Sequence, residues 1–94
     1  AIAFGSGGVR AFGTPAMIGL MEKAAAELAD QYLPAGQTTV GTVVNINHTA
    51  ATPVGMKVTA QAELIEIDGR RLVFKVDAMD EAGPIGSGTH ERFI

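Results

Sequence analysis

Three polar residues stand where the surrounding pattern predicts apolar or constrained positions: Thr14, Glu22 and His48. Glu22 falls among small and apolar residues of a predicted helix, and a carboxylate shielded from water can act as a base or a nucleophile. His48 ends a predicted strand, where an imidazole can move a proton or donate to a carbonyl oxygen. These residue types are therefore candidates for acid–base or nucleophilic chemistry.

Each of the three residues also has a purely structural interpretation. Thr14 stands directly before Pro15 at the start of the helix, and a threonine in that place is expected to act as the N-cap. Glu22 can be a half-exposed helix residue, and His48 can be a hydrogen-bonded residue at the end of its strand. The residue types alone leave both interpretations open.

Several other kinds of site are excluded or disfavoured. The chain has no cysteine, which excludes disulfides, thiolate nucleophiles and cysteine metal sites. His48, His90 and Glu91 do not have the spacing of a metal-binding motif, so no metal site is predicted. Ser6 and Ser87 have glycine neighbours but do not lie in the G-x-S-x-G sequence of a nucleophile elbow.

Length and charge limit the possible partners. The chain has 94 residues, 47% of them hydrophobic, and 7 basic against 10 acidic side chains give a net charge of −3. We therefore expect a single domain over residues 1–94 that does not bind nucleic acid. No apolar run is long enough to span a membrane and no stretch resembles a secretory signal, which together predict a cytoplasmic protein.

A glycine-rich segment and one helix make up the first third of the chain. Residues 1–13 contain four glycines with Phe4 and Phe12, which predicts a loop that covers another part of the molecule as a lid. A helix is expected over residues 15–32. Its apolar face consists of Met17, Ile18, Met21, Ala24, Ala25, Leu28 and Tyr32. Glu22 lies at the edge of that face.

The rest of the chain alternates with a period of two, as strands do. Strands are expected over 39–49, 56–66, 72–78 and 85–94, with a two-residue hairpin turn at Asp68–Gly69 and a second turn over 80–84. These elements predict an α+β domain in which a long helix covers a four-stranded antiparallel meander. A hot-dog fold, with a curved antiparallel sheet wrapped around a long central helix, is the favoured form. A cystatin-like arrangement of helix on sheet remains open.

Four stretches of sequence resemble the small hot-dog thioesterases related to fluoroacetyl-CoA thioesterase. They are FGTPAMIGLMEKAA at 12–25, TVGTVVNINH at 39–48, ATPVG at 51–55 and GSGTHER at 86–92. The joint spacing is specific, with eight residues from Thr14 to Glu22 and 26 from Glu22 to His48. The resemblance covers nearly the whole chain.

This resemblance implies an acyl-CoA thioesterase that hydrolyses its substrate with Thr14, Glu22 and His48. By the same match, the backbone amide of Gly41 is expected to hold the thioester carbonyl. Phenylalanines of the lid select the fluorinated substrate in the founding enzyme of that family. Phe4 and Phe12 are the candidates to close the acyl pocket here, and an acyl group other than fluoroacetyl is expected. CoA is then part of the substrate and no separate cofactor is implied. A domain that binds acyl-CoA without turnover and a hot-dog dehydratase or hydratase are the alternatives.

The helix geometry adds an expectation about assembly. Eight helical residues rise about 12 Å, so Thr14 and Glu22 of one regular helix cannot hydrogen-bond to each other. Either the loop at Thr14 folds back or the two residues meet across a subunit interface. We therefore expect a homodimer whose active site draws on both chains.

Overall fold

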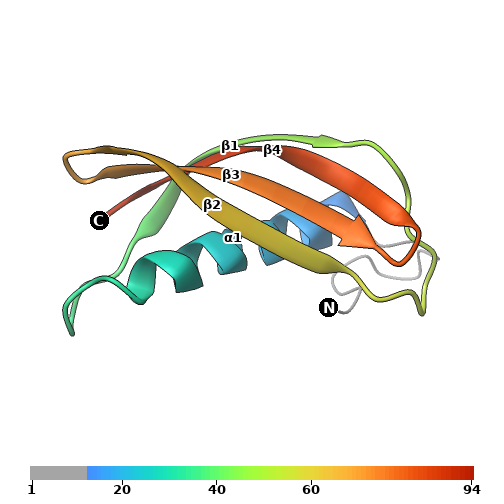
Figure 1. Cartoon of the computed structure of the whole chain (residues 1–94), viewed down its shortest axis with the longest axis horizontal. Coiled ribbons are helices and arrows are strands. Elements are labelled where there is room, and N and C mark those ends of the chain that lie inside the picture. Colours follow the sequence, from blue (N-terminus) through green and yellow to red (C-terminus); the bar gives the residue numbers. More distant parts are fainter. Residues whose placement is uncertain (1–12) are drawn as a thin grey trace.

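One helix lies across the concave face of a curved antiparallel sheet, so the molecule has two layers (Figure 1). The computed structural model describes residues 13–94, and these form one helix and four strands. The elements are α1 (Thr14–Asp30), β1 (Val40–His48), β2 (Thr59–Asp68), β3 (Arg71–Asp80) and β4 (Gly83–Phe93). The predicted α+β class is confirmed. Within residues 13–94, no helix has the length and apolar character needed to cross a membrane.

The order of the strands corrects one prediction. The sheet has the order β1-β4-β3-β2, so only β2, β3 and β4 form a meander, and β1 pairs with β4 at the far edge instead of with β2. The connection between β1 and β2 is too long for a tight hairpin. Its first residues stay bonded to β4 beyond the His48–Gly86 pair, because the N–H groups of Thr49 and Ala50 donate to the carbonyl of Ile85 at 2.7 and 3.2 Å.

The hairpin turn between β2 and β3 lies one residue later than predicted. Asp68 pairs with Arg71, so the two loop residues are Gly69 and Arg70. Gly69 has a φ of 61°, a conformation that glycine adopts without a steric penalty. The Asp-Gly sequence therefore located the hairpin, but the register of the flanking strands decided which residues form its loop.

The helix differs from its prediction at both ends. Its N-cap is Gly13, with no side-chain capping bond, and Thr14 is already inside the first turn beside Pro15. The helix ends at Asp30 because the N–H of Tyr32 bonds to the carbonyl of Ala29, which tightens the last turn. The side chain of Tyr32 is therefore 80% exposed instead of continuing the apolar face.

The core lies between α1 and the middle of the sheet. Met17, Met21 and Ala25 are fully buried, as the helical periodicity predicts. They pack with side chains of the sheet such as Phe74 and Ile85. The helix lies closest to β2 and makes fewer contacts with β1. The inner face of β1 is therefore less covered, and Val44 remains 43% exposed there.

Candidate active site

The first candidate pair joins the start of α1 to the end of β1. The hydroxyl oxygen of Thr14 lies 2.7 Å from Nδ1 of His48, a hydrogen bond between residues 34 positions apart. The strand β4 passes close to α1 at this point because Gly86 has no side chain. A Cβ on Gly86 would lie only 2.5 Å from Sδ of Met17 on α1. Helix, β1 and β4 together fix the Thr14–His48 pair.

The hydroxyl of Thr14 therefore bonds a side chain instead of capping the helix. The predicted capping role is wrong, because the N-cap is Gly13 and the hydroxyl is directed at His48. The other ring nitrogen of His48, Nε2, is buried and has no hydrogen-bond partner among residues 13–94. Buried polar atoms are rarely left unpaired, so this nitrogen is available to an incoming group. A shallow hollow of about 250 Å³ borders the same side chain and is lined by His48, Thr49, Ala50 and Ala51.

The second candidate pair is formed by Glu22 and Gly41. Glu22 is half-buried on the side of α1 that turns toward the sheet. Its Oε2 lies 3.2 Å from the point that a Cβ on Gly41 would occupy. Glycine is thus the residue that lets β1 approach the carboxylate at this point.

A β-bulge explains how Gly41 comes to face the helix. The pairing of β1 with β4 shifts between Gly41 and Val43, so Thr42 is an extra residue in the strand. Strict alternation would place Gly41 and His48 on opposite faces of the sheet, because one position is odd and the other even. A bulge reverses that alternation. Gly41 therefore lies on the same face as His48.

Two residues that the sequence analysis did not select lie beside Gly41. The point that its Cβ would occupy is 3.1 Å from Cε1 of His90 and 3.3 Å from Nη1 of Arg92. Both side chains are buried, at 1% and 9% exposure. The predicted helix offers Glu22 only small and apolar neighbours, whereas β4 brings the guanidinium of Arg92 to the same point on Gly41. The alternation of β4 was the available clue, since it directs an arginine into the core.

The two pairs lie at different ends of the molecule. Gly41 and His48 are seven residues apart on β1, which corresponds to roughly 20 Å along a strand. Thr14 and Glu22 are separated by about 12 Å along the helix. One chain therefore brings together Thr14 with His48 and Glu22 with Gly41, but it does not bring the two pairs to one point. The remaining candidates, Phe4 and Phe12, lie outside the described residues.

The Thr14–His48 end is supported by Asp80, the last residue of β3. The buried hydroxyl of Thr52, in the connection after β1, donates to Oδ2 of Asp80 at 2.8 Å. The N–H groups of Ala82 and Gly83 donate to the other carboxylate oxygen at 2.8 and 3.1 Å. Thr52 first, and then these backbone donors, lower the pKa of Asp80, because they favour its charged form.

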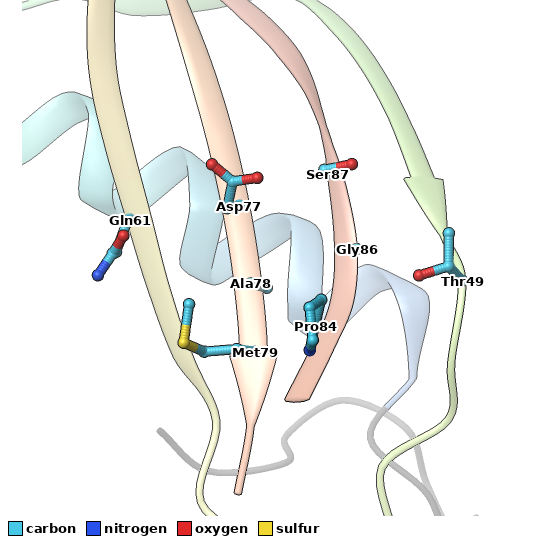
Figure 2. A pocket seen from close by; sticks show the side chains of 8 residues that line it. All are labelled: Thr49, Gln61, Asp77, Ala78, Met79, Pro84, Gly86 and Ser87. Carbon is cyan, nitrogen blue, oxygen red and sulfur yellow. The ribbon is translucent and has the colours of Figure 1, made fainter. Parts of the chain in front are cut away.

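A further pocket lies on the face of the sheet away from α1. Figure 2 shows it with the helix passing behind the strands, and its volume is about 250 Å³. Its lining consists of Thr49, Gln61, Asp77, Ala78, Met79, Pro84, Gly86 and Ser87. None of the candidate catalytic residues lines this pocket. Among residues 13–94, no group of histidine and acidic side chains is arranged to hold a metal ion.

Comparison with known proteins relates this geometry to a family. The family model of the fluoroacetyl-CoA-specific thioesterases (FlK) matches residues 1–94. The fluoroacetyl-CoA thioesterase of Streptantibioticus cattleyicolor is 48% identical over 83 residues, which cover 88% of this chain and 60% of the relative. The chain thus spans about three fifths of the length of that relative.

Solved structures agree with the sequence match. A structure of the fluoroacetyl-CoA thioesterase superposes with a TM-score of 0.84 at 48% identity, covering 88% of this chain and 62% of that one. A variant of that enzyme with bound fluoroacetate and CoA gives 0.86 at 45% identity, covering 94% and 70%. A hot-dog-like protein from Thermanaerovibrio acidaminovorans gives 0.83 at 30% identity, covering 89% and 62%. The predicted hot-dog fold is confirmed, and the chain belongs to the fluoroacetyl-CoA-specific thioesterase family.

Proposed function

We propose that this protein hydrolyses an acyl-CoA thioester to a free acid and CoA. The observation that carries the proposal is the 2.7 Å hydrogen bond between Thr14 and His48, whose second ring nitrogen is buried without a partner among residues 13–94. A histidine held by a hydroxyl at one nitrogen and free at the other is ready to exchange a proton with a substrate. Membership of a family described as fluoroacetyl-CoA-specific thioesterases supports the same reaction.

The roles follow from what thioester hydrolysis requires. The carboxylate of Glu22 attacks the thioester carbonyl or activates the water that attacks it, and a carbon–oxygen bond forms. The amide of Gly41 donates to the carbonyl oxygen while negative charge develops on it. The carbon–sulfur bond then breaks, and His48 supplies the proton that the CoA sulfur takes up. Where Glu22 attacks directly, water then hydrolyses the resulting acyl anhydride, which releases the acid and restores the carboxylate. In either route a proton from the consumed water returns to His48. Thr14 holds His48 in the orientation that this transfer needs.

The distance between the two pairs leads us to propose a homodimer with composite sites. Edge strand β1 carries exposed apolar side chains, with Val40 at 62% and Val43 and Val44 at 43% exposure. Exposed strand edges readily pair with another chain. If two β1 strands pair antiparallel about an axis at Asn45, with the bulged residue Thr42 left unpaired, Gly41 of one chain lies opposite His48 of the partner subunit. Each active site then contains Glu22 and Gly41 from one chain and Thr14 and His48 from the other.

The acyl group of the substrate is proposed to be short. The related enzyme is named for fluoroacetyl-CoA, and a variant of it was solved with fluoroacetate and CoA. Fluoroacetyl-CoA and acetyl-CoA are therefore the first substrates to compare. The lid role of Phe4 and Phe12 and the cytoplasmic location stay predictions.

Release of free thiol from a panel of acyl-CoA esters tests the proposal. The Glu22→Gln variant keeps the size of the side chain but removes its capacity as base or nucleophile. We expect its kcat to fall by at least about 10²-fold, the low end for loss of an acid–base group. Binding of acyl-CoA, measured by calorimetry, should be largely retained. A variant that releases thiol at the parent rate would contradict the proposal and favour a domain that only binds acyl-CoA.

A further inference from the structure

The bulge in β1 is held from both sides by side chains of one neighbouring strand. Thr39 lies just before the bulge and Val43 lies at its end, with Gly41 between them. On β4, Arg92 contacts the first of these residues and His90 contacts the second. The two side chains therefore form hydrogen bonds to residues on either side of Gly41.

The contacts form a continuous buried chain of hydrogen bonds. Arg92 donates from Nε to the hydroxyl of Thr39 at 2.6 Å and from Nη2 to the carbonyl of Thr39 at 3.0 Å. Its Nη1 lies 3.2 Å from Nε2 of His90, and Nδ1 of His90 lies 2.8 Å from the carbonyl oxygen of Val43. Thr39, His90 and Arg92 are all buried. A buried guanidinium is tolerated only where its donors find acceptors, and Thr39 and His90 provide those acceptors.

The chemistry of arginine fixes which atom donates in each of these hydrogen bonds. A guanidinium only donates, so Nε2 of His90 must accept and carries no hydrogen. The hydrogen of the neutral ring is then on Nδ1, which donates to the carbonyl of Val43. Arg92 thereby sets the tautomer of His90, and His90 in turn holds the backbone of Val43.

We infer that His90 and Arg92 are positioning residues that hold the bulge and thereby orient the amide of Gly41 for the reaction. The inference rests on the proposed role of Gly41 as donor to the thioester carbonyl. The same two side chains also pack against Gly41 itself, with Cε1 of His90 and Nη1 of Arg92 at 3.1 and 3.3 Å from the position of a Cβ. A donor that is aimed in advance stabilises the charge that develops in the transition state, and a small displacement weakens it.

Two substitutions of His90 separate this role from a general contribution to stability. In His90→Asn the side-chain amide can still donate to the carbonyl of Val43, whereas in His90→Leu nothing can. We expect His90→Leu to lower kcat by about 10-fold or more with KM within about twofold, because the donor acts on the transition state. His90→Asn should recover most of the lost kcat.

Phe74 provides a matched control, because its buried ring lies 6.5 Å from that of His90 between centroids. Phe74→Leu disturbs the same part of the core without touching the hydrogen bonds. It should lower Tm and leave kcat near the parent value. If His90→Leu does not fold, the pair Thr39→Val and Thr39→Ser provides the same comparison, since only serine keeps the hydroxyl that accepts from Arg92.

The one-bond ¹H–¹⁵N residual dipolar coupling of Gly41 reports the orientation of its amide directly, whereas its chemical shift also responds to loss of the nearby imidazole ring. We expect the coupling to change in His90→Leu and to return toward the parent value in His90→Asn. A Gly41 coupling that does not change in His90→Leu would overturn the inference. If the coupling changes while kcat stays at the parent value, Gly41 is held by His90 as inferred, but its proposed role in the reaction is wrong.

Discussion

The two ends of β1 lie on the same face of the sheet, the one turned toward α1, but are built in different ways. At the His48 end, one hydrogen bond to Thr14 fixes the ring and its other nitrogen is left unpaired among residues 13–94. At the Gly41 end, a buried chain of hydrogen bonds through Arg92 and His90 holds the backbone. One end holds a side chain with a nitrogen free to exchange a proton, and the other holds a fixed backbone segment.

This difference matches what the two ends are proposed to do. A proton-transfer group must change its protonation and its partner during the reaction, so it is an advantage that only one hydrogen bond holds it. An oxyanion donor must not move, because reorganisation at the moment of reaction reduces its effect. The contrast therefore predicts that substitutions at the Gly41 end act through geometry, whereas substitutions at the His48 end act through lost hydrogen-bonding groups.

Gly41→Ala should have the largest effect on geometry. Its Cβ would lie 3.1 to 3.3 Å from atoms of His90, Glu22 and Arg92, so either β1 or these side chains must shift. We expect kcat to fall by about 10²-fold, comparable to the loss of an oxyanion donor. Thr42→Ala is the matched control, because Thr42 is exposed and its hydroxyl donates outward to the carbonyl of Glu91. Equal rates for the two variants would contradict the importance of the close approach at Gly41.

Substitution of Thr14 should have a smaller effect. Thr14→Val removes the hydroxyl that bonds His48 but keeps the shape of the side chain. We expect kcat to fall by about 10-fold, since the imidazole remains but is no longer held. Thr14→Ser keeps the hydroxyl and should stay within about threefold of the parent. Steady-state kinetics with the best acyl-CoA substrate distinguishes the two variants, and a serine variant as slow as the valine variant would argue against the hydrogen bond.

The smallest effect on the reaction is expected at Thr52, which supports the His48 end through Asp80. Because the folded state lowers the pKa of Asp80, the stabilisation is present above the unfolded value of about 3.9 and is lost as pH falls through the folded value. Thr52→Val removes the main cause of this shift and should lower Tm by several degrees at neutral pH. The difference from the parent should shrink as the pH is lowered below about 4. A Tm difference that does not depend on pH would show that Asp80 is not its source.

The sequence predicted the local features of this fold better than the long-range ones. Helical periodicity identified Met17, Met21 and Ala25 as core, because their burial follows from spacing on one helix. The pairing of β1 with β4 was not predicted, since it joins residues 38 to 53 positions apart and leaves no pattern in either strand alone. Tyr32 was assigned to the helix because its spacing fits, although the chain turns just before it.

The site was predicted in the same uneven way. Thr14 and Glu22 could be judged too far apart from the rise of a helix alone, and the structure agrees. The bulge that turns Gly41 toward the helix depends on a bond from His90 to Val43, 47 residues earlier, which no local pattern encodes. The position of Arg92 beside Gly41 depends on the same register of β4.

Complementation between two inactive chains tests most directly whether the two ends of β1 act together across subunits. Glu22→Gln disables the Gly41 end and His48→Gln disables the His48 end, so each variant alone should be inactive. In a mixed dimer one of the two composite sites carries both substitutions and the other carries none. Random exchange of equal amounts should therefore restore about one quarter of the parent activity. A mixture no more active than the separate variants, although dimers have exchanged, would contradict a site shared between two chains.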